Sequence, residues 1–157
     1  MHPQFPVSVD LKTLSIASSA FGNKKFIPSK YSCDGENISP PLAIGSIPEK
    51  AKSLAIILDD PDAPLRTWTH WVLWNIPPSA KVNEGNAPGT QGINDFGQNH
   101  YGGPCPPSGT HRYLFKVYAL DDVLELNSSA RKADLEKAMS GHIIAFGELT
   151  GLYKRNR

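Results

Sequence analysis

Two short segments of this chain carry titratable side chains on conformationally restricted backbone. Residues 59–64 (DDPDAP) hold three aspartates and two prolines, and residues 102–113 (GGPCPPSGTHRY) end on His111 and Tyr113. The run 67–74 (TWTHWVLW), which lies between them, contains His70. Because proline fixes φ, such turns present their side chains with little conformational freedom. Carboxylate, imidazole and phenol groups held in this way predict a small polar pocket.

Asp60 is the carboxylate best placed to meet an imidazole. It follows the apolar run 54–58, after which the chain turns back into the segment that holds His70. This hairpin-like connection brings Asp60 and His70 to neighbouring strands near the same end, where a carboxylate orients the ring and favours its charged form. The simpler interpretation is that the aspartates only form a turn, as Asp-Pro sequences commonly do.

The polar groups of these segments suit an anionic ligand. Imidazoles, a phenol O–H and the backbone N–H groups of a loop are hydrogen-bond donors that bind small anions or phosphate esters. Asp60 adds a negative wall that could receive an amine or keep a histidine protonated. By strand alternation, His111 and Tyr113 face one way and Arg112 faces the other. We therefore expect Arg112 to form an ion pair with Asp62 in a structural role.

Catalysis has weaker support in the sequence. GxSxG, GxGxxG and Walker motifs are absent. Asp60 and His70 could act as base and acid, but the only evident nucleophile is Cys105, which lies between prolines without a means of activation. CxxC and HxxxH spacings are also absent, so we expect no metal site.

Length and composition are those of one ordinary globular domain over residues 1–157. A formal net charge of +1 argues against nucleic acid as a partner. No apolar run approaches the ~18 residues of a membrane span, so no integral membrane segment is expected. Residues 1–5 lack the features of a secretory signal, which favours a cytoplasmic location and reduced thiols at Cys33 and Cys105. Both cysteines nevertheless lie in turn-rich segments that could meet.

Short apolar runs separated by 14 prolines and 13 glycines predict many short strands joined by structured turns. One helix is expected at residues 130–140, with Ser128 or Ser129 as its cap and Gly141 just past its end. The long Gly- and Pro-rich connection 77–110 favours a binding rim over a flexible linker. Strands are expected at residues 7–15, 54–58, 67–76, 112–120 and 142–153.

Alternation also predicts which side chains share a face of each strand. In the strand 67–76 one face would hold Trp68, His70, Val72, Trp74 and Ile76. In the strand 112–120 the shared face would hold Tyr113, Phe115, Val117 and Ala119.

These motifs resemble the phosphatidylethanolamine-binding protein family. The similar segments are DPDAP at 60–64, Trp-x-His ending at His70, and the Pro-Pro to His-Arg-Tyr segment at 106–113. YSCDGENISPPL at 31–42 and YGGPCPP at 101–107 are similar to its bacterial and archaeal branch, which is called Raf-kinase-inhibitor-like. The likeness runs from about residue 14 to residue 153, nearly the whole chain.

The resemblance implies a mainly β domain, a β-sandwich with a large antiparallel sheet and one or two peripheral helices. It implies an anion pocket without metal or organic cofactor, and as partners a small anion or phospholipid head group and possible serine protease or kinase targets. By motif position, with the neighbouring rim included, the ligand-binding residues would be Asp60, Trp68, His70, Gly103, Pro106, Pro107, His111 and Tyr113.

We therefore expect a non-enzymatic binding protein whose pocket takes a small anion or a phosphate ester such as phosphorylethanolamine, and which regulates or inhibits a partner protein. The alternative is a serine protease inhibitor. A third hypothesis, from a different class, is a phosphate-ester hydrolase that uses Asp60 and His70.

Overall fold

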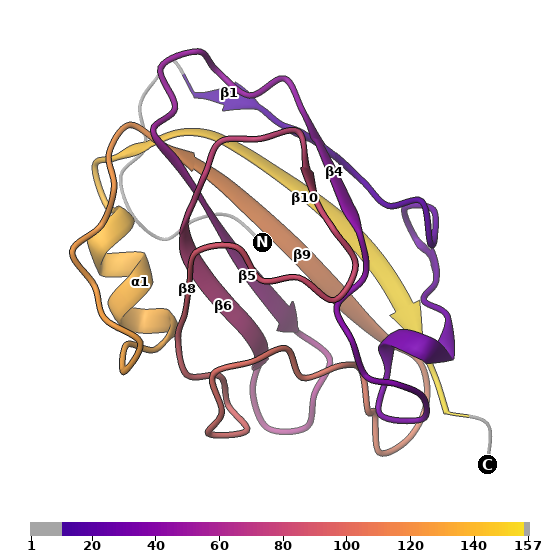
Figure 1. Cartoon of the computed structure of the whole chain (residues 1–157). Coiled ribbons are helices and arrows are strands. Elements are labelled where there is room, and N and C mark those ends of the chain that lie inside the picture. Colours follow the sequence, from indigo (N-terminus) through magenta and orange to yellow (C-terminus); the bar gives the residue numbers. More distant parts are fainter. Residues whose placement is uncertain (1–10, 156–157) are drawn as a thin grey trace.

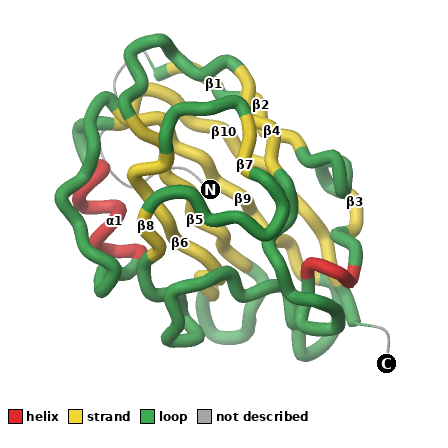
Figure 2. Tube along the Cα trace, in the orientation of Figure 1, coloured by secondary structure: helices red, strands yellow, loops and turns green. Residues whose placement is uncertain are grey.

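The computed structural model describes residues 11–155. Two sheets pack face to face in it (Figures 1 and 2). The larger sheet has seven strands in the order β1-β10-β9-β5-β6-β8, with β3 added beside β10. Its strands are β1 (Lys12–Thr13), β3 (Lys25–Phe26), β5 (Ser53–Asp60), β6 (Trp68–Ile76), β8 (Thr90–Gln91), β9 (His111–Leu120) and β10 (Ile143–Tyr153). The smaller sheet has the order β2-β4-β7 and consists of β2 (Ser15–Ala17), β4 (Leu42–Gly45) and β7 (Lys81–Val82).

The mainly β sandwich predicted from the sequence is confirmed, although the larger sheet is mixed. Its four long strands, β10, β9, β5 and β6, pair antiparallel. The two-residue strands β1 and β3 instead run parallel to β10. Besides these strands, the described chain contains one α-helix, α1 (Lys132–Met139), and a short 3-10 helix (Ser29–Tyr31).

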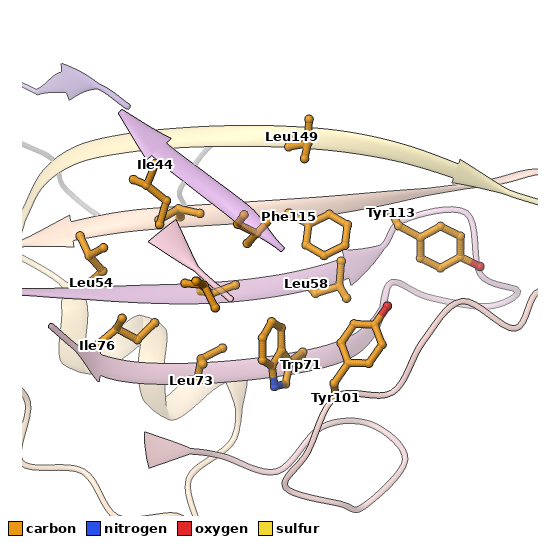
Figure 3. Close-up of a cluster of buried hydrophobic side chains, with 14 of the residues drawn as sticks. Ile44, Leu54, Leu58, Trp71, Leu73, Ile76, Tyr101, Tyr113, Phe115 and Leu149 are labelled. Atoms are coloured by element: carbon orange, nitrogen blue, oxygen red, sulfur yellow. The ribbon is translucent and has the colours of Figure 1, made fainter. Parts of the chain in front are cut away.

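A hydrophobic core fills each face of the larger sheet. The first lies between the two sheets and includes Ile44 of β4 together with residues of β5, β6 and β9 (Figure 3). The second lies between the larger sheet and α1, whose buried apolar stripe is formed by Leu135 and Met139. Apolar side chains in β5 alternate between the two cores, which explains why its sequence is a continuous apolar run.

The observed helix begins later than expected. Its N-cap is Arg131, whose backbone N–H donates to the Asp134 carboxylate at 2.9 Å. Neither Ser128 nor Ser129 caps it, because residues 127–130 form a turn of their own, closed by the N–H of Ala130 on the carbonyl of Asn127. Gly141 follows the helix with φ 82°, as its position predicted.

The long strands 54–58, 67–76, 112–120 and 142–153 are confirmed within a few residues. Of the predicted strand 7–15, residues 7–10 lie outside the described residues, and the remainder forms β1 and the start of β2. The connection 77–110 has few regular elements, namely the two-residue strands β7 and β8.

The predicted faces of β6 are wrong in part, at Val72 and Trp74, because this strand contains two irregularities. Leu58 pairs with Trp71 and Asp59 with Thr69, so His70 is an extra residue in a β-bulge. A second shift lies between the pairs formed by Leu54 and Ile56. As a result Ile76 joins the core between the sheets, whereas Val72 and Trp74 pack toward α1. In β9, by contrast, Tyr113, Phe115, Val117 and Ala119 share one core, as predicted.

Cys33 and Cys105 form a disulfide, which corrects the expectation of reduced thiols. The physical reason is that their two loops are neighbours, since the N–H of Cys33 also donates to the carbonyl of Pro104 at 3.1 Å. The cytoplasmic location remains a prediction. Within residues 11–155 no helix has the length and apolar character needed to cross a membrane.

Candidate ligand-binding pocket

A cavity of about 240 Å³ opens where the end of β5 meets the beginnings of β6 and β9. All the predicted ligand-binding residues except Gly103 line it. The complete lining is Asp60, Ala63, Pro64, Trp68, His70, Phe96, Cys105, Pro106, Pro107, His111 and Tyr113. The antiparallel pairing explains this meeting, because it brings the DPDAP turn beside the first residues of the two neighbouring strands.

Gly103 lies behind the cavity wall. Its N–H donates to the side-chain oxygen of Asn37 at 2.8 Å. A Cβ at this position would lie 2.3 Å from the carbonyl oxygen of Tyr31, so only glycine permits the two loops to approach so closely. The residue thus supports the rim and is not part of the lining.

The β-bulge turns the His70 ring into the pocket. Only 3% of this residue is exposed, and its ring packs edge-on against the rings of Tyr113 and Phe96. Its Nδ1 lies 2.7 Å from the carbonyl oxygen of Gly102. Since a carbonyl only accepts, Nδ1 carries a proton, and the neutral ring has its lone pair at Nε2. Burial lowers the pKa of His70, which favours this neutral form.

Asp60 pairs with His111 instead of with His70. Its Oδ2 lies 2.7 Å from Nδ1 of His111, and both side chains are buried. Its other oxygen accepts the backbone N–H of Asp62 at 2.8 Å. The first Asp of the DPDAP turn therefore orients the His111 ring, and the prediction of a carboxylate beside an imidazole holds for a different histidine.

Two buried hydrogen-bond donors of the lining have no hydrogen-bond partner in the described chain. They are the indole Nε1–H of Trp68 and the hydroxyl of Tyr113. Burial, reinforced by the nearby Asp60 carboxylate, raises the pKa of Tyr113 well above its ordinary value, so its hydroxyl keeps the proton. Leaving a buried donor unpaired costs about 1–3 kcal/mol. Two such groups in one cavity indicate a place for a hydrogen-bond acceptor.

Arg112 and Asp62 form the predicted ion pair outside the cavity. The guanidinium binds the two carboxylate oxygens at 2.9 Å and 2.8 Å, and the backbone N–H of Arg112 adds a further bond at 2.9 Å. These bonds lower the pKa of Asp62. The Arg112 side chain is 56% exposed, so the pair fastens the turn at the surface.

Several residues that shape the site escaped sequence reasoning. Asn94 is buried, and its side-chain amide donates to the carbonyl oxygens of His70 at 3.0 Å and His100 at 2.9 Å. Phe96 forms part of the cavity wall. Neither follows from local pattern, because both lie in the irregular connection 77–110. In residues 11–155 no group of three or more His, Cys, Asp or Glu side chains is arranged to hold a metal ion.

Comparisons with known proteins agree with this architecture. The family model described as phosphatidylethanolamine-binding protein matches residues 17–154. The chain is 56% identical over 149 residues to a UPF0098 protein of Pyrococcus abyssi, covering 88% of this chain and 84% of the relative. It is 51% identical over 150 residues to a UPF0098 protein of Methanothermobacter thermautotrophicus, covering 90% and 99%.

Two solved structures are similar over nearly their whole length. One is a putative phosphatidylethanolamine-binding protein homologue of Chlamydia trachomatis, with a TM-score of 0.89 and 43% identity, covering 92% of this chain and 99% of that one. The other is YbcL of E. coli, described as a new member of the mammalian family, with a TM-score of 0.84 and 30% identity, covering 91% and 99%. With matches of this extent in sequence and in structure, the chain belongs to the phosphatidylethanolamine-binding protein family.

Proposed function

We propose that this protein is a non-enzymatic binding protein whose pocket takes a small anion or phosphate monoester, and that the loaded protein regulates or inhibits a partner. The observation that carries the proposal is the pair of unpartnered buried donors, Trp68 Nε1–H and the Tyr113 hydroxyl. Family membership supports binding as the kind of function. An oxyanion accepts from several donors at once, and bonds to charged acceptors are the stronger ones.

The Asp60 carboxylate does not argue against an anion in the cavity. The negative charge of Asp60 is already engaged by His111 and by the N–H of Asp62. This arrangement leaves the carboxylate with little attraction for an amine. His70 can take up a proton at Nε2 when an anion arrives, which would add a charged donor to the two neutral ones. The phosphate group therefore dominates recognition, and the amine of phosphorylethanolamine contributes less.

Covalent catalysis is disfavoured by the state of the thiol. Cys105 lines the cavity, but its sulfur is bonded to Cys33 and cannot attack a substrate. Asp60 is held by two donors and does not approach His70 as a base–acid pair would require. Binding without turnover is the simpler function for such a site.

The partner would meet the rim of the pocket. Leu65 is fully exposed in the turn that follows the cavity wall, and its φ of 76° is rare for a residue with a large side chain. A projecting apolar residue on a constrained loop is also what a serine protease could accept in its specificity pocket, which supports the inhibitor as the second candidate. An inhibition assay on a panel of serine proteases, with the wild type and with Leu65→Asp, separates the two candidate functions. Inhibition by the wild type that Leu65→Asp loses would favour the protease inhibitor.

Calorimetric titration tests the proposal. Inorganic phosphate and phosphorylethanolamine should each bind saturably to the wild type, and ethanolamine should not. His70→Ala should abolish or strongly weaken binding, while His142→Ala, at an exposed histidine paired with Asp121, should bind as the wild type does. Release of inorganic phosphate from phosphorylethanolamine that disappears in His70→Ala would support a hydrolase instead.

A further inference from the structure

A buried cluster of charges lies on the face of the larger sheet opposite the pocket. At its centre is Asp59, whose Oδ2 accepts from Nζ of Lys116 at 2.8 Å and from Nζ of Lys132 at 2.7 Å. Its Oδ1 accepts the hydroxyl of Thr69 at 2.8 Å. The side chains of Asp59 and Lys116 are each 1% exposed, and that of Lys132, at the start of α1, is 23% exposed. The cluster therefore joins β5, β6, β9 and α1.

Stability alone is a poor reason for such a cluster. Removing ions from water is costly, and well-packed apolar side chains of similar volume usually stabilise a core as well or better. Charged groups do, however, specify geometry, because their bonds require particular positions. With both ammonium groups on one oxygen and the hydroxyl on the other, the Asp59 carboxylate has a single favourable orientation.

Each member of the cluster on β5 and β6 is next in sequence to a pocket residue. Asp59 precedes Asp60, and Thr69 precedes His70. Since successive side chains on a strand point to opposite faces, holding Asp59 and Thr69 on the far face directs their successors into the pocket. His70 depends most on such support from its neighbour, because it occupies the β-bulge and has no cross-strand partner to fix its register.

Thr69 is held at its backbone as well as at its side chain. Its N–H donates to Oδ2 of Asp95 at 2.7 Å, and its carbonyl accepts the N–H of Asp95 at 2.9 Å. The hydroxyl bond to Asp59 is the contact that ties this residue to the charge cluster. The strand is thus fastened from two sides immediately before the bulge.

We propose that Asp59, Lys116, Lys132 and Thr69 are positioning residues for the ligand pocket, which hold the bulge so that the His70 ring faces the bound anion. The inference rests on the proposed function as far as the ligand is concerned. The orientation of His70 can be measured without any ligand, so the two can fail separately.

The test compares Thr69→Val, which keeps the shape of the side chain, with Thr69→Ser, which keeps the hydroxyl. Thr13→Val on β1 is the control, because Thr13 pairs with Phe146, toward the other end of β10 from the residue that pairs with Tyr113. In long-range ¹H–¹⁵N spectra without ligand, the wild type and Thr69→Ser should show His70 protonated at Nδ1 in one environment. Thr69→Val should lose this single signature, and its affinity for inorganic phosphate should fall about tenfold.

Lys132→Met is the second variant, because the partial exposure of Lys132 makes it the member whose loss the fold tolerates best. Lys132→Met should also lose the single His70 signature, and Lys132→Arg should keep it. Wild-type His70 signals in both Thr69→Val and Lys132→Met would overturn the positioning role. Failure of the wild type to bind phosphate would refute the proposed function, and the His70 signals would still decide the role of the cluster.

Discussion

Replacing Tyr113 with phenylalanine removes a single oxygen from the pocket and keeps the ring that stacks on His111 and packs on His70. The hydroxyl is buried and has no hydrogen-bond partner in the described part of the chain. Its removal should therefore have opposite effects on folding and on binding. A hydroxyl that only supports the fold would not behave in this way.

The expected changes in stability and in affinity follow from the surroundings of the hydroxyl without ligand and with an anion bound. Without ligand, removing an unpaired buried group should leave the free energy of unfolding unchanged or raise it by about 1 kcal/mol, equivalent to about 3 °C in Tm. With an anion bound, the lost bond joins a donor to a charged acceptor, which contributes about 1.5–3 kcal/mol. The Kd of inorganic phosphate should thus rise about 10- to 150-fold.

The assay pairs urea unfolding without ligand with calorimetric titration of phosphate. Tyr101→Phe is the matched control, because the Tyr101 hydroxyl is buried and donates to the carbonyl of Tyr31 at 2.7 Å. That variant should lose about 1 kcal/mol of stability and keep its affinity. The reasoning is refuted if Tyr113→Phe loses stability as Tyr101→Phe does while binding phosphate as tightly as the wild type.

Four further predictions concern pH, which has two effects, the disulfide and the surface ion pair. Because burial lowers the pKa of His70, the unfolded chain binds its proton more tightly, and stability should fall as the pH drops below about 6.5. Sulfate keeps its charge in this range, so its affinity should rise as the pH falls and His70 takes up a proton. Calorimetry that finds the affinity for sulfate rising from about pH 5 to pH 8 would contradict a protonated His70 in the complex. Replacing Cys33 and Cys105 by alanine removes a crosslink between residues 72 apart in sequence. The chain-entropy model predicts that the free energy of unfolding, measured in urea, falls by about 4 kcal/mol. A loss below about 1 kcal/mol would show that the bridge constrains the unfolded chain little. Arg112→Ala should cost less than about 1 kcal/mol in the same assay, since its pair with Asp62 is exposed, and a larger loss would mean that the pair fastens more than the turn.

The pocket was predictable because its residues belong to rigid local motifs. Prolines in 59–64 and 102–113 restrict the backbone wherever the sheet places it, so Asp60, His111 and Tyr113 could be assigned before the fold was known. The orientation of His70 could be assigned only by assuming regular alternation. His70 does share the pocket with Trp68, as alternation predicted, but the pattern failed beyond it at Val72 and Trp74, because a β-bulge depends on how two strands pair, which no single strand encodes.

Contacts between residues far apart in the sequence were the other feature that the sequence did not predict. Lys116 lies within an apolar strand and Lys132 at a helix start, and both meet Asp59 from distant positions in the sequence. A lysine in the middle of an apolar run was the available signal, since such a charge is buried only with a partner. The disulfide between Cys33 and Cys105 was not predicted, although the sequence did contain a signal for it. An inference about the cellular compartment outweighed the observation that both loops are rich in turns.

The indole N–H signals offer the most direct measurement of anion binding. The chain has three tryptophans, and the indole groups of Trp71 and Trp74 already donate to Gln91 and to the carbonyl of Leu126. In ¹H–¹⁵N spectra, adding phosphate should therefore shift the Trp68 indole signal strongly and saturably, and should leave the other two nearly unchanged. If all three signals stay in place up to a high phosphate concentration, no anion binds at this donor, and the central claim is wrong.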